Sequence, residues 1–420
     1  MRLRAKRHAN NARIPRQNVI AKAPGVLDAD NAVSSAANDE QERPSPVSVS
    51  DDLVPSLHEG NTENWNLVLP TPLTSHNSSH TTRELLDDPM PIALSSSEGR
   101  NSSPQGVTPD CLDFSGLNLC CPINVDEIIT RWMNSYIPIP GQKIKTYPPG
   151  VIEFMTKMLK AFAGAATRGR RLSFIHHTQM TNQQANSPLS TCLSLIRICE
   201  NPLPGSEQAA TTVLQREMRN IIEQHSLYKN DLTILSEFQA YLIYLLVLYF
   251  RLGESLHRLR SETDDFTRQA LINLQTIAHY ACRQGLTCVA DQQRARPRWE
   301  EWIVAEAKRR TLYVMYLFDS ILASRDNLSI FLGTELHGLP AAASKDLWEA
   351  TDRGDWERKY NMFLAEWSEL GPTIDEMWPI PEDMDDLSIA KRRSRVDRWL
   401  EDVDEFGTML YAVTVCTHAG

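Results

Sequence analysis

The segment RWEEWIVAEAKRRTLYVMYLFDSILASRD, residues 298–326, decides the fold of this chain. Apolar residues recur along it at helical spacing, and it contains an almost continuous apolar run from Leu312 to Phe318. The pattern predicts one long helix over 298–323. Aromatic residues at this spacing are more typical of a hydrophobic core than of a cofactor-binding site. We therefore expect a buried aromatic set on this helix: Trp299, Trp302, Tyr313, Tyr316 and Phe318.

A second apolar run, AYLIYLLVLYF at residues 240–250, predicts another core helix. It has 11 residues, which is too short to span a bilayer. The start of the chain, MRLRAKRHANNARI, carries positive charge, but no apolar stretch follows that would make it a signal peptide. We therefore expect no membrane partner.

Other helical patterns lie on both sides of these two runs, and no strand ladder is visible. Asn124 and Ser206 are of the residue types that cap helix N-termini. The sequence predicts an all-α fold with eight to ten helices from Asn124 onward. Besides 232–252 and 298–323, the expected helices cover 125–136, 151–166, 189–199, a stretch after Ser206, 265–282, 389–400 and 403–415.

Composition divides the chain into three parts. Residues 1–27 form a basic tail, and residues 28–110 are rich in Ser, Pro and acidic residues. The second part cannot bury enough apolar surface to offset its ordering entropy, so we expect a disordered linker there. Its acidic-hydrophobic clusters, such as 84–88, suit activation segments, although composition favours a plain linker. Residues 111–420 form the predicted all-helical domain.

The formal net charge of −10 argues against nucleic-acid binding by the whole surface, so any such contact must be local. Phosphate contacts need only local positive charge, whereas base reading needs a rigid frame. The basic tail contributes these DNA-backbone candidates: Arg2, Arg4, Lys6, Arg7, Arg13 and Arg16. A flexible tail or an import signal is the simpler interpretation of that stretch. A second basic cluster contributes these nuclear-import candidates: Lys391, Arg392, Arg393 and Arg395.

Metal and catalytic patterns are weak. The eight cysteines include no C-x-x-C pair, so no zinc site is predicted from them. Cys192 and Cys199, two helical turns apart, are expected to be buried. The adjacent His176 and His177, with Gln179, are the most enzyme-like cluster, but neighbouring side chains point apart, so we expect a hydrogen-bonding role.

Two further groups of charged residues have both a functional and a structural interpretation. The run of acidic residues over 382–386 lacks the central glycine of a calcium loop, which favours a solvated loop. Arg309 and Arg310 could meet an acidic partner, but pairing with Glu306 or a neighbouring helix is the simpler expectation. No phosphate loop, nucleophile elbow or H-E-x-x-H motif is present. We therefore expect no enzyme, no catalytic residue and no cofactor in this chain.

Several segments from Leu112 to the end share their order and spacing with one family. They are LDFSGLNLCCPINVDEIITRWMNSYIP, PPGVIEFMTKMLKAFA, RRLSFIHHTQ, PLSTCLSLIRICENPLPGSEQ, EFQAYLIYLLVLYF, RWEEWIVAEAKRRT, GTELHGLPAAASKDLWEA and VDRWLEDVDEFGTMLYAV. Together they resemble the fungal-specific transcription factor domain of zinc-cluster (Zn2Cys6) regulators. The resemblance implies an all-α module that receives signals and supports dimerisation or activation, without reading DNA bases itself.

The chain departs from that family at its N-terminus. The family's DNA reader is a short module in which six cysteines hold two zinc ions, and this sequence shows no such module. Its first residues resemble the basic stretch that follows the last cysteine of the module. Either the module was lost or the start of the coding sequence is misassigned. Zinc is expected only if that module exists. The sequence contains no sustained heptad pattern, so it does not predict a dimerising coiled coil.

From the resemblance we expect the chain to be a nuclear transcriptional regulator of a fungal metabolic gene set. A secondary-metabolite gene cluster is one candidate for that gene set. The expected partners are DNA, reached through a missing module or another protein, together with coactivators or other regulators in a homodimer or heterodimer. The alternative is a protein without its own module that modulates an intact DNA-binding regulator. The third hypothesis is a helical enzyme with an unfamiliar active site. The sequence shows no group of acid-base or metal-binding residues that supports it.

Overall fold

Helices make up almost all of the secondary structure, as the sequence predicts. The computed structural model describes residues 112–134, 137, 140, 144–181, 187–203, 205–225, 229–253 and 260–415, which all belong to one compact unit. The all-α fold class is thereby confirmed for the described part of the chain. The basic tail at 1–27 and the linker predicted at 28–110 lie outside the described residues.

Thirteen α-helices lie within the described residues. They are α1 (Asp126–Asn134), α2 (Pro149–Thr167), α3 (His177–Thr181), α4 (Pro188–Leu195), α5 (Glu207–Glu223), α6 (Asp231–Val247), α8 (Arg260–Arg283), α9 (Val289–Gln292), α10 (Trp299–Arg325), α11 (Lys345–Trp348), α12 (Arg353–Glu366), α13 (Asp386–Asp402) and α14 (Glu405–Val415). A π-helix, Leu248–Leu252, continues α6, and short 3-10 helices cover Ile196–Cys199, Thr334–Leu336 and Ile374–Met377. All nine expected helices are present. The sequence pattern missed α12 and the short helices α3, α9 and α11.

Caps explain several of the helix starts. Asn230 accepts a hydrogen bond from the backbone N–H of Thr233 at 2.8 Å and so begins α6. The Ser206 hydroxyl does not cap α5, although that role was expected. It donates instead to the carbonyl oxygen of Leu203 at 2.8 Å, because the chain turns back on itself before the helix begins.

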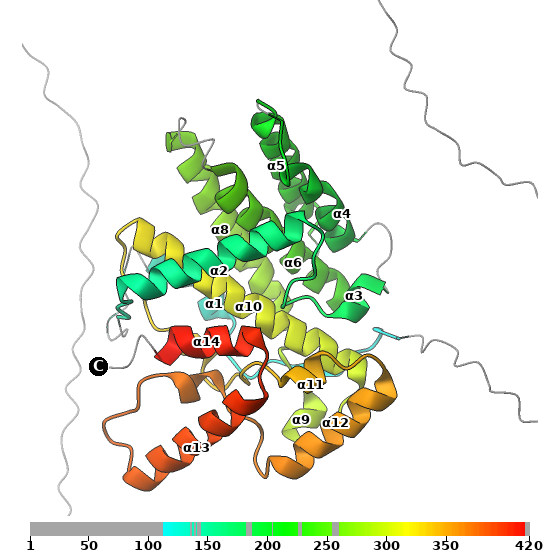
Figure 1. Ribbon diagram of the computed structural model, residues 1–420, viewed down its shortest axis with the longest axis vertical. Coiled ribbons are helices and arrows are strands. Elements are labelled where there is room, and N and C mark those ends of the chain that lie inside the picture. Colours follow the sequence, from blue (N-terminus) through cyan, green and yellow to red (C-terminus); the bar gives the residue numbers. More distant parts are fainter. Residues whose placement is uncertain are drawn as a thin grey trace, which may run out of the picture. The chain divides into compact units, whose positions relative to one another are not determined.

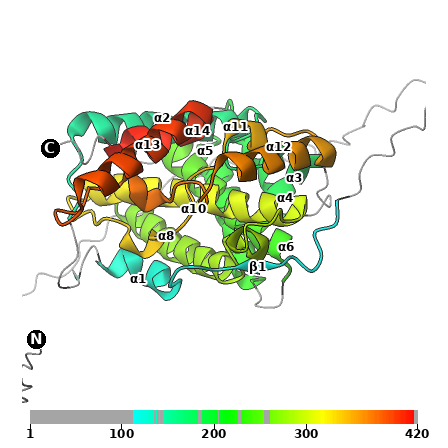
Figure 2. The same ribbon diagram turned by 90° about the horizontal axis from the view of Figure 1, so that it is seen from below.

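Helix α10 occupies the centre of the domain. Every residue from Trp299 to Ala323 is buried. The helix contacts α2, α6, α8 and α12. Figure 2 shows α2 and α14 on one side of it and α6 and α8 on the other. The five aromatic residues predicted for its core are all buried, which confirms that expectation.

Two hydrophobic clusters divide α10 along its length. The first half, up to Ala307, packs with α11 and α12 in a cluster rich in tryptophan. The second half, from Leu312, packs against α2, α6 and α8 in the larger cluster. The polar stretch over residues 308–311 lies between the two clusters and is itself buried. Buried charges require ion-pair or hydrogen-bond partners, so the segments that pack against this stretch must provide such groups.

Helix α6 is the second core helix. Together with its π-helical continuation it spans Asp231–Leu252, which is long and apolar enough to cross a membrane by length and composition. However, 83% of its most apolar window is buried inside the domain. The helix packs against α2, α4, α8 and α10. It is therefore a core helix in this structure, as the sequence predicted (Figure 1).

An extended segment, residues 112–120, lies against the start of α10, and we call it the N-terminal strap. Glu300 accepts a hydrogen bond from the backbone N–H of Asp113 at 3.0 Å. Glu301 accepts one from Asn118 at 3.1 Å. The strap therefore uses two buried carboxylates of the first turn of α10, and Figure 2 shows it passing beneath the domain from α1.

The strap ends in the two-stranded sheet of the described chain, which corrects the expectation that no strands pair. Strand β1 (Leu119–Cys120) pairs antiparallel with β2 (Thr287–Cys288). Gly285 has a φ of +121°, and a Cβ added there would lie 2.4 Å from the Cβ of Leu119. Only glycine accommodates both the backbone conformation and the close approach.

Candidate functional site

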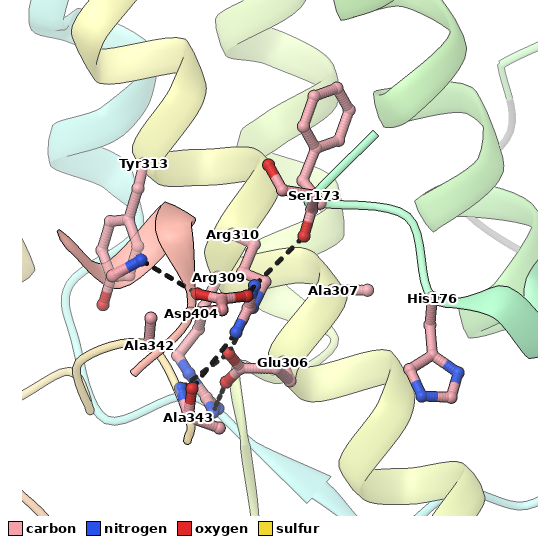
Figure 3. Close-up of polar contacts among 12 residues, drawn as sticks. Ser173, His176, Glu306, Ala307, Arg309, Arg310, Tyr313, Ala342, Ala343 and Asp404 are labelled. Atoms are coloured by element: carbon pink, nitrogen blue, oxygen red, sulfur yellow. Dashed lines mark hydrogen bonds and ion pairs between the residues drawn. The ribbon is translucent and has the colours of Figure 1, made fainter. Parts of the chain in front are cut away.

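The polar stretch of α10 is organised around Glu306 (Figure 3). One carboxylate oxygen of Glu306 accepts hydrogen bonds from Nε of Arg310 at 2.7 Å and from the backbone N–H of Ala343 at 2.9 Å. The other oxygen accepts from Nη2 of Arg309. The expectation that both arginines pair with Glu306 is confirmed.

Arg310 extends the network beyond its own helix. Its Nη1 donates to Asp404 at 2.5 Å and to the carbonyl oxygen of Ser173 at 3.1 Å, and its Nη2 donates to the carbonyl oxygen of Ala343 at 3.2 Å. The guanidinium carbon also lies 4.2 Å from the centroid of the Trp348 ring. One side chain thus joins α10 to the segment after α2, to the loop before α11 and to the start of α14 (Figure 3).

The charges in this cluster balance one another. Burial alone raises the pKa of Glu306, but the positive charges of Arg309 and Arg310 outweigh burial, so the pKa lies below its usual value. Burial lowers the pKa of Arg309, and the charge of Glu306 together with its other ionisable neighbours more than reverses that effect. Glu306 and Arg309 therefore stay charged, and both arginines remain bonded to Glu306. That arrangement holds the fold together and does not leave Glu306 ready to exchange a proton with a substrate.

The histidine pair lies where α3 begins. The His176 and His177 ring centroids are 4.3 Å apart, so the expectation that the rings point apart is wrong. The local reason is that His177 opens α3 whereas His176 still belongs to the loop before it. Their nitrogens have different partners: Nδ1 of His176 lies 2.8 Å from the Thr178 hydroxyl, and Nε2 of His177 lies 2.7 Å from the carbonyl oxygen of Ala350.

His176 is fully buried between the rings of Trp348 and Trp299. Burial, followed by the nearby His177 and arginine charges, lowers the pKa of His176 well below its usual value. The ring is therefore neutral at physiological pH. Gln179 accepts a hydrogen bond from the His176 backbone N–H at 3.0 Å and so belongs to the same packed corner.

The described residues contain no group of three or more His, Cys, Asp or Glu that could hold a metal ion. The acidic side chains over 382–386 are exposed, and Asp385 caps α13 by accepting from the Ser388 N–H at 3.0 Å. Cys192 and Cys199 are buried, as expected.

The four import candidates lie on α13, and most of them contact the segment 369–378. Lys391 donates to Glu369 at 2.6 Å. Arg392 donates to the carbonyl oxygen of Glu376 at 2.7 Å, and Arg395 donates to the Glu376 carboxylate at 2.9 Å. Arg393 is exposed. An import receptor that bound all four would therefore have to displace internal contacts. The six DNA-backbone candidates lie at residues 2–16, outside the described residues.

A cavity of about 290 Å³ lies beside the polar stretch of α10. Side chains from α10, α12 and α13 line it together with the loop over residues 338–344. The aromatic residues on its walls are Trp302, Tyr360, Phe363, Trp367 and Trp399. Sequence reasoning missed this site because its walls come from segments far apart in the chain. Tyr360, Phe363 and Trp367, three and four residues apart, were the available signal.

The polar groups of the cavity lie close together. The Tyr360 hydroxyl donates a hydrogen bond to Asp291, and both residues line the wall. Burial raises the pKa of Asp291, although the Tyr360 bond and the charge of Arg309 oppose that effect. Arg309, also on the wall, donates to the carbonyl oxygen of Leu286 at 2.6 Å. The cavity therefore has a mostly apolar lining that includes five aromatic side chains, with the Asp291 carboxyl group held near the Arg309 guanidinium.

No family model matches the chain, and neither a curated protein nor a solved structure matches it.

Proposed function

We propose that the chain is a nuclear regulator of transcription that acts on a fungal metabolic gene set through its helical domain. A secondary-metabolite cluster is one candidate for this gene set. Promoter recognition would come from a zinc module outside this sequence or from a partner protein. The support is the ordered set of segments that resemble the fungal-specific transcription factor domain, together with the way these segments meet.

The observation that carries the proposal is the convergence on Arg310. Its guanidinium binds Ser173, Ala343 and Asp404. Each of these residues lies in a different one of the segments that carry the resemblance. The co-occurrence of these segments thus has a physical reason in this chain, because one buried charge on α10 requires partners from three other segments of the set. Such a centre holds helices in place for contacts with other macromolecules and leaves no ionisable group of this network free for chemistry.

The test is a tethering experiment with the full chain. Fused to a heterologous DNA-binding domain in a fungal reporter strain, the chain should change reporter transcription relative to that domain alone. The Glu306→Gln fusion should lose this effect, whereas a fusion with Glu357→Gln, at an exposed ion pair, should keep it. An unchanged reporter, with the wild-type fusion present in the nucleus, would contradict the proposal.

The alternative function is modulation of an intact zinc-cluster regulator by heterodimerisation. The resemblance of residues 112–420 to a domain that supports dimerisation favours it. Co-purification of the native chain with a zinc-cluster protein from fungal nuclei would support it. Specific promoter binding by the purified chain alone, persisting at physiological salt, would exclude the need for such a partner.

A further inference from the structure

We propose that the cavity between α10, α12, α13 and the loop 338–344 binds an uncharged, ring-containing, mostly apolar small molecule that donates a hydrogen bond to Asp291. This inference goes beyond the regulatory function proposed above. It concerns binding by the domain itself, so it can be tested on the purified chain without a promoter or a reporter.

The size of the cavity fits a ligand of two or three fused rings. Its volume is about 290 Å³. An apolar cavity of about 150 Å³ already takes up benzene, and sites for small organic ligands begin at about 300 Å³. The space therefore exceeds what packing defects leave in a protein interior, where voids larger than a water molecule are few.

The walls select for flat apolar rings. Trp302, Tyr360, Trp367 and Trp399 line the cavity and are all buried, so these side chains contact little solvent. Leu347 adds an aliphatic wall. Aromatic side chains pack best with other rings in offset or edge-to-face arrangements. The Trp399 indole N–H already donates to the carbonyl oxygen of Ala342 at 2.8 Å. This bond fixes the orientation of the Trp399 ring, and the indole N–H is not available to donate to a ligand.

The cavity has an exposed rim through which a ligand can enter. Gln292, Gly338, Leu370 and Asp402 line it and are exposed, while four of the five aromatic lining residues are buried and Phe363 is half-buried. Entry therefore requires no unfolding of the two hydrophobic clusters. The gradient from an exposed rim to a buried aromatic interior is typical of a ligand site and differs from a sealed packing void.

The charges around the cavity decide the class of ligand. Arg309 forms an ion pair with Glu306, so the lining carries no uncompensated positive charge that would attract an anion. Asp291 and Asp402 then leave the lining with excess negative charge, which disfavours an anionic ligand. Arg309 also acts on Asp291 and so disfavours a second cation at that carboxylate. The ligand class that remains is a neutral hydrogen-bond donor. The Asp291 carboxylate accepts from Tyr360 and Cys288, and its two oxygens have capacity for one further hydrogen bond.

Three naphthalene probes of nearly equal size test this assignment: 2-naphthol, 2-methoxynaphthalene and 2-naphthoate. Their binding to the full chain is measured by titration calorimetry and by quenching of tryptophan fluorescence. We expect 2-naphthol to bind about tenfold more tightly than the ether, since a hydrogen bond to a charged group contributes about that factor. The anionic 2-naphthoate should bind more weakly than both.

Two variants place the binding in the cavity. Ala343→Leu adds bulk to the lining while keeping the backbone bonds of Ala343 to Glu306 and Arg310. Its matched control is Ala365→Leu, at an exposed position of α12 outside the lining. We expect the first variant to weaken binding of 2-naphthol and the ether about tenfold or more, as a filled cavity excludes them, and the control to leave binding unchanged.

Asp291→Asn tests the polar contact separately. It should reduce the affinity for 2-naphthol to that for the ether and leave the affinity for the ether unchanged, which also shows that the walls are intact. The assignment is overturned if no probe binds, if Ala343→Leu and Ala365→Leu behave alike, or if 2-naphthoate binds as tightly as 2-naphthol. Equal affinity for 2-naphthol and the ether in the wild-type chain would also overturn it.

Discussion

Replacing Glu306 with glutamine should destabilise the domain more than its small change in shape suggests. Glu306 is completely buried and accepts bonds from Arg309, Arg310 and the Ala343 backbone. Glutamine keeps an oxygen of the same size but removes the negative charge. Arg310 would still have Asp404, whereas Arg309 would lose the carboxylate that it contacts directly.

The magnitude follows from the cost of leaving a buried charge uncompensated. Breaking a buried ion pair by removing one partner costs about 3–5 kcal/mol. For a domain of this length that corresponds to a fall in Tm of about 5–8 °C. The matched change Glu357→Gln affects an ion pair with Arg296 at 3.4 Å whose side chains are 39% and 34% exposed, so solvent screens it and the change should cost less than about 1 kcal/mol.

The assay is urea unfolding of the full chain followed by circular dichroism at 222 nm, repeated at neutral and acid pH. The pKa of Glu306 is lowered in the folded state, so its stabilising contribution is complete above the unfolded value of 4.5 and is lost as the pH falls through the folded value. The difference between wild type and variant should therefore shrink in acid. If Glu306→Gln costs no more than Glu357→Gln at pH 7, the network is not the centre of stability that its contacts imply.

Other substitutions test separate features of the fold. Gly285→Ala should lower the free energy of unfolding by more than about 2 kcal/mol, because its Cβ would collide with Leu119 and its φ is strained; Gly150→Ala, with open space around it in the first turn of α2, should be neutral or stabilising. His176→Phe should change the pH dependence of stability, because the folded pKa of His176 is depressed: its contribution is complete above the unfolded value of 6.5 and is lost progressively as the pH falls below that value. The variant should lack this loss when urea titrations at neutral pH and at pH 5.5 are compared. Trp399→Phe should cost about 1 kcal/mol in the same assay through loss of its hydrogen bond to Ala342, and a variant as stable as wild type would contradict that role.

Short-range patterns in the sequence predicted the helical core well. The apolar run over 312–318 and the run over 240–250 are long enough to indicate buried helices without any tertiary information. The pairing of Glu306 with Arg309 and Arg310 could also be predicted, because residues three and four apart face each other on a helix.

Long-range contacts escaped the same reasoning. Arg310 and Asp404 are separated by 94 positions, and nothing in either local sequence indicates the partner. The cavity draws on segments from Pro122 to Asp402, so no window of sequence contains it. The close contact between the His176 and His177 rings depends on a helix that begins between the two residues, and the side-chain rule used for continuous helices and strands did not apply there.

The N-terminal strap sets a practical boundary for work with this domain. A shortened fragment that starts at the first helix, near Asp126, would remove the backbone donors that Glu300 and Glu301 use and would leave β2 unpaired. Arg353 would still bind Glu300, at 2.6 Å, but Glu301 would lose its bond from Asn118. Recombinant versions should therefore begin upstream of Leu112, and affinity tags should be joined there through a spacer long enough to keep the strap in place.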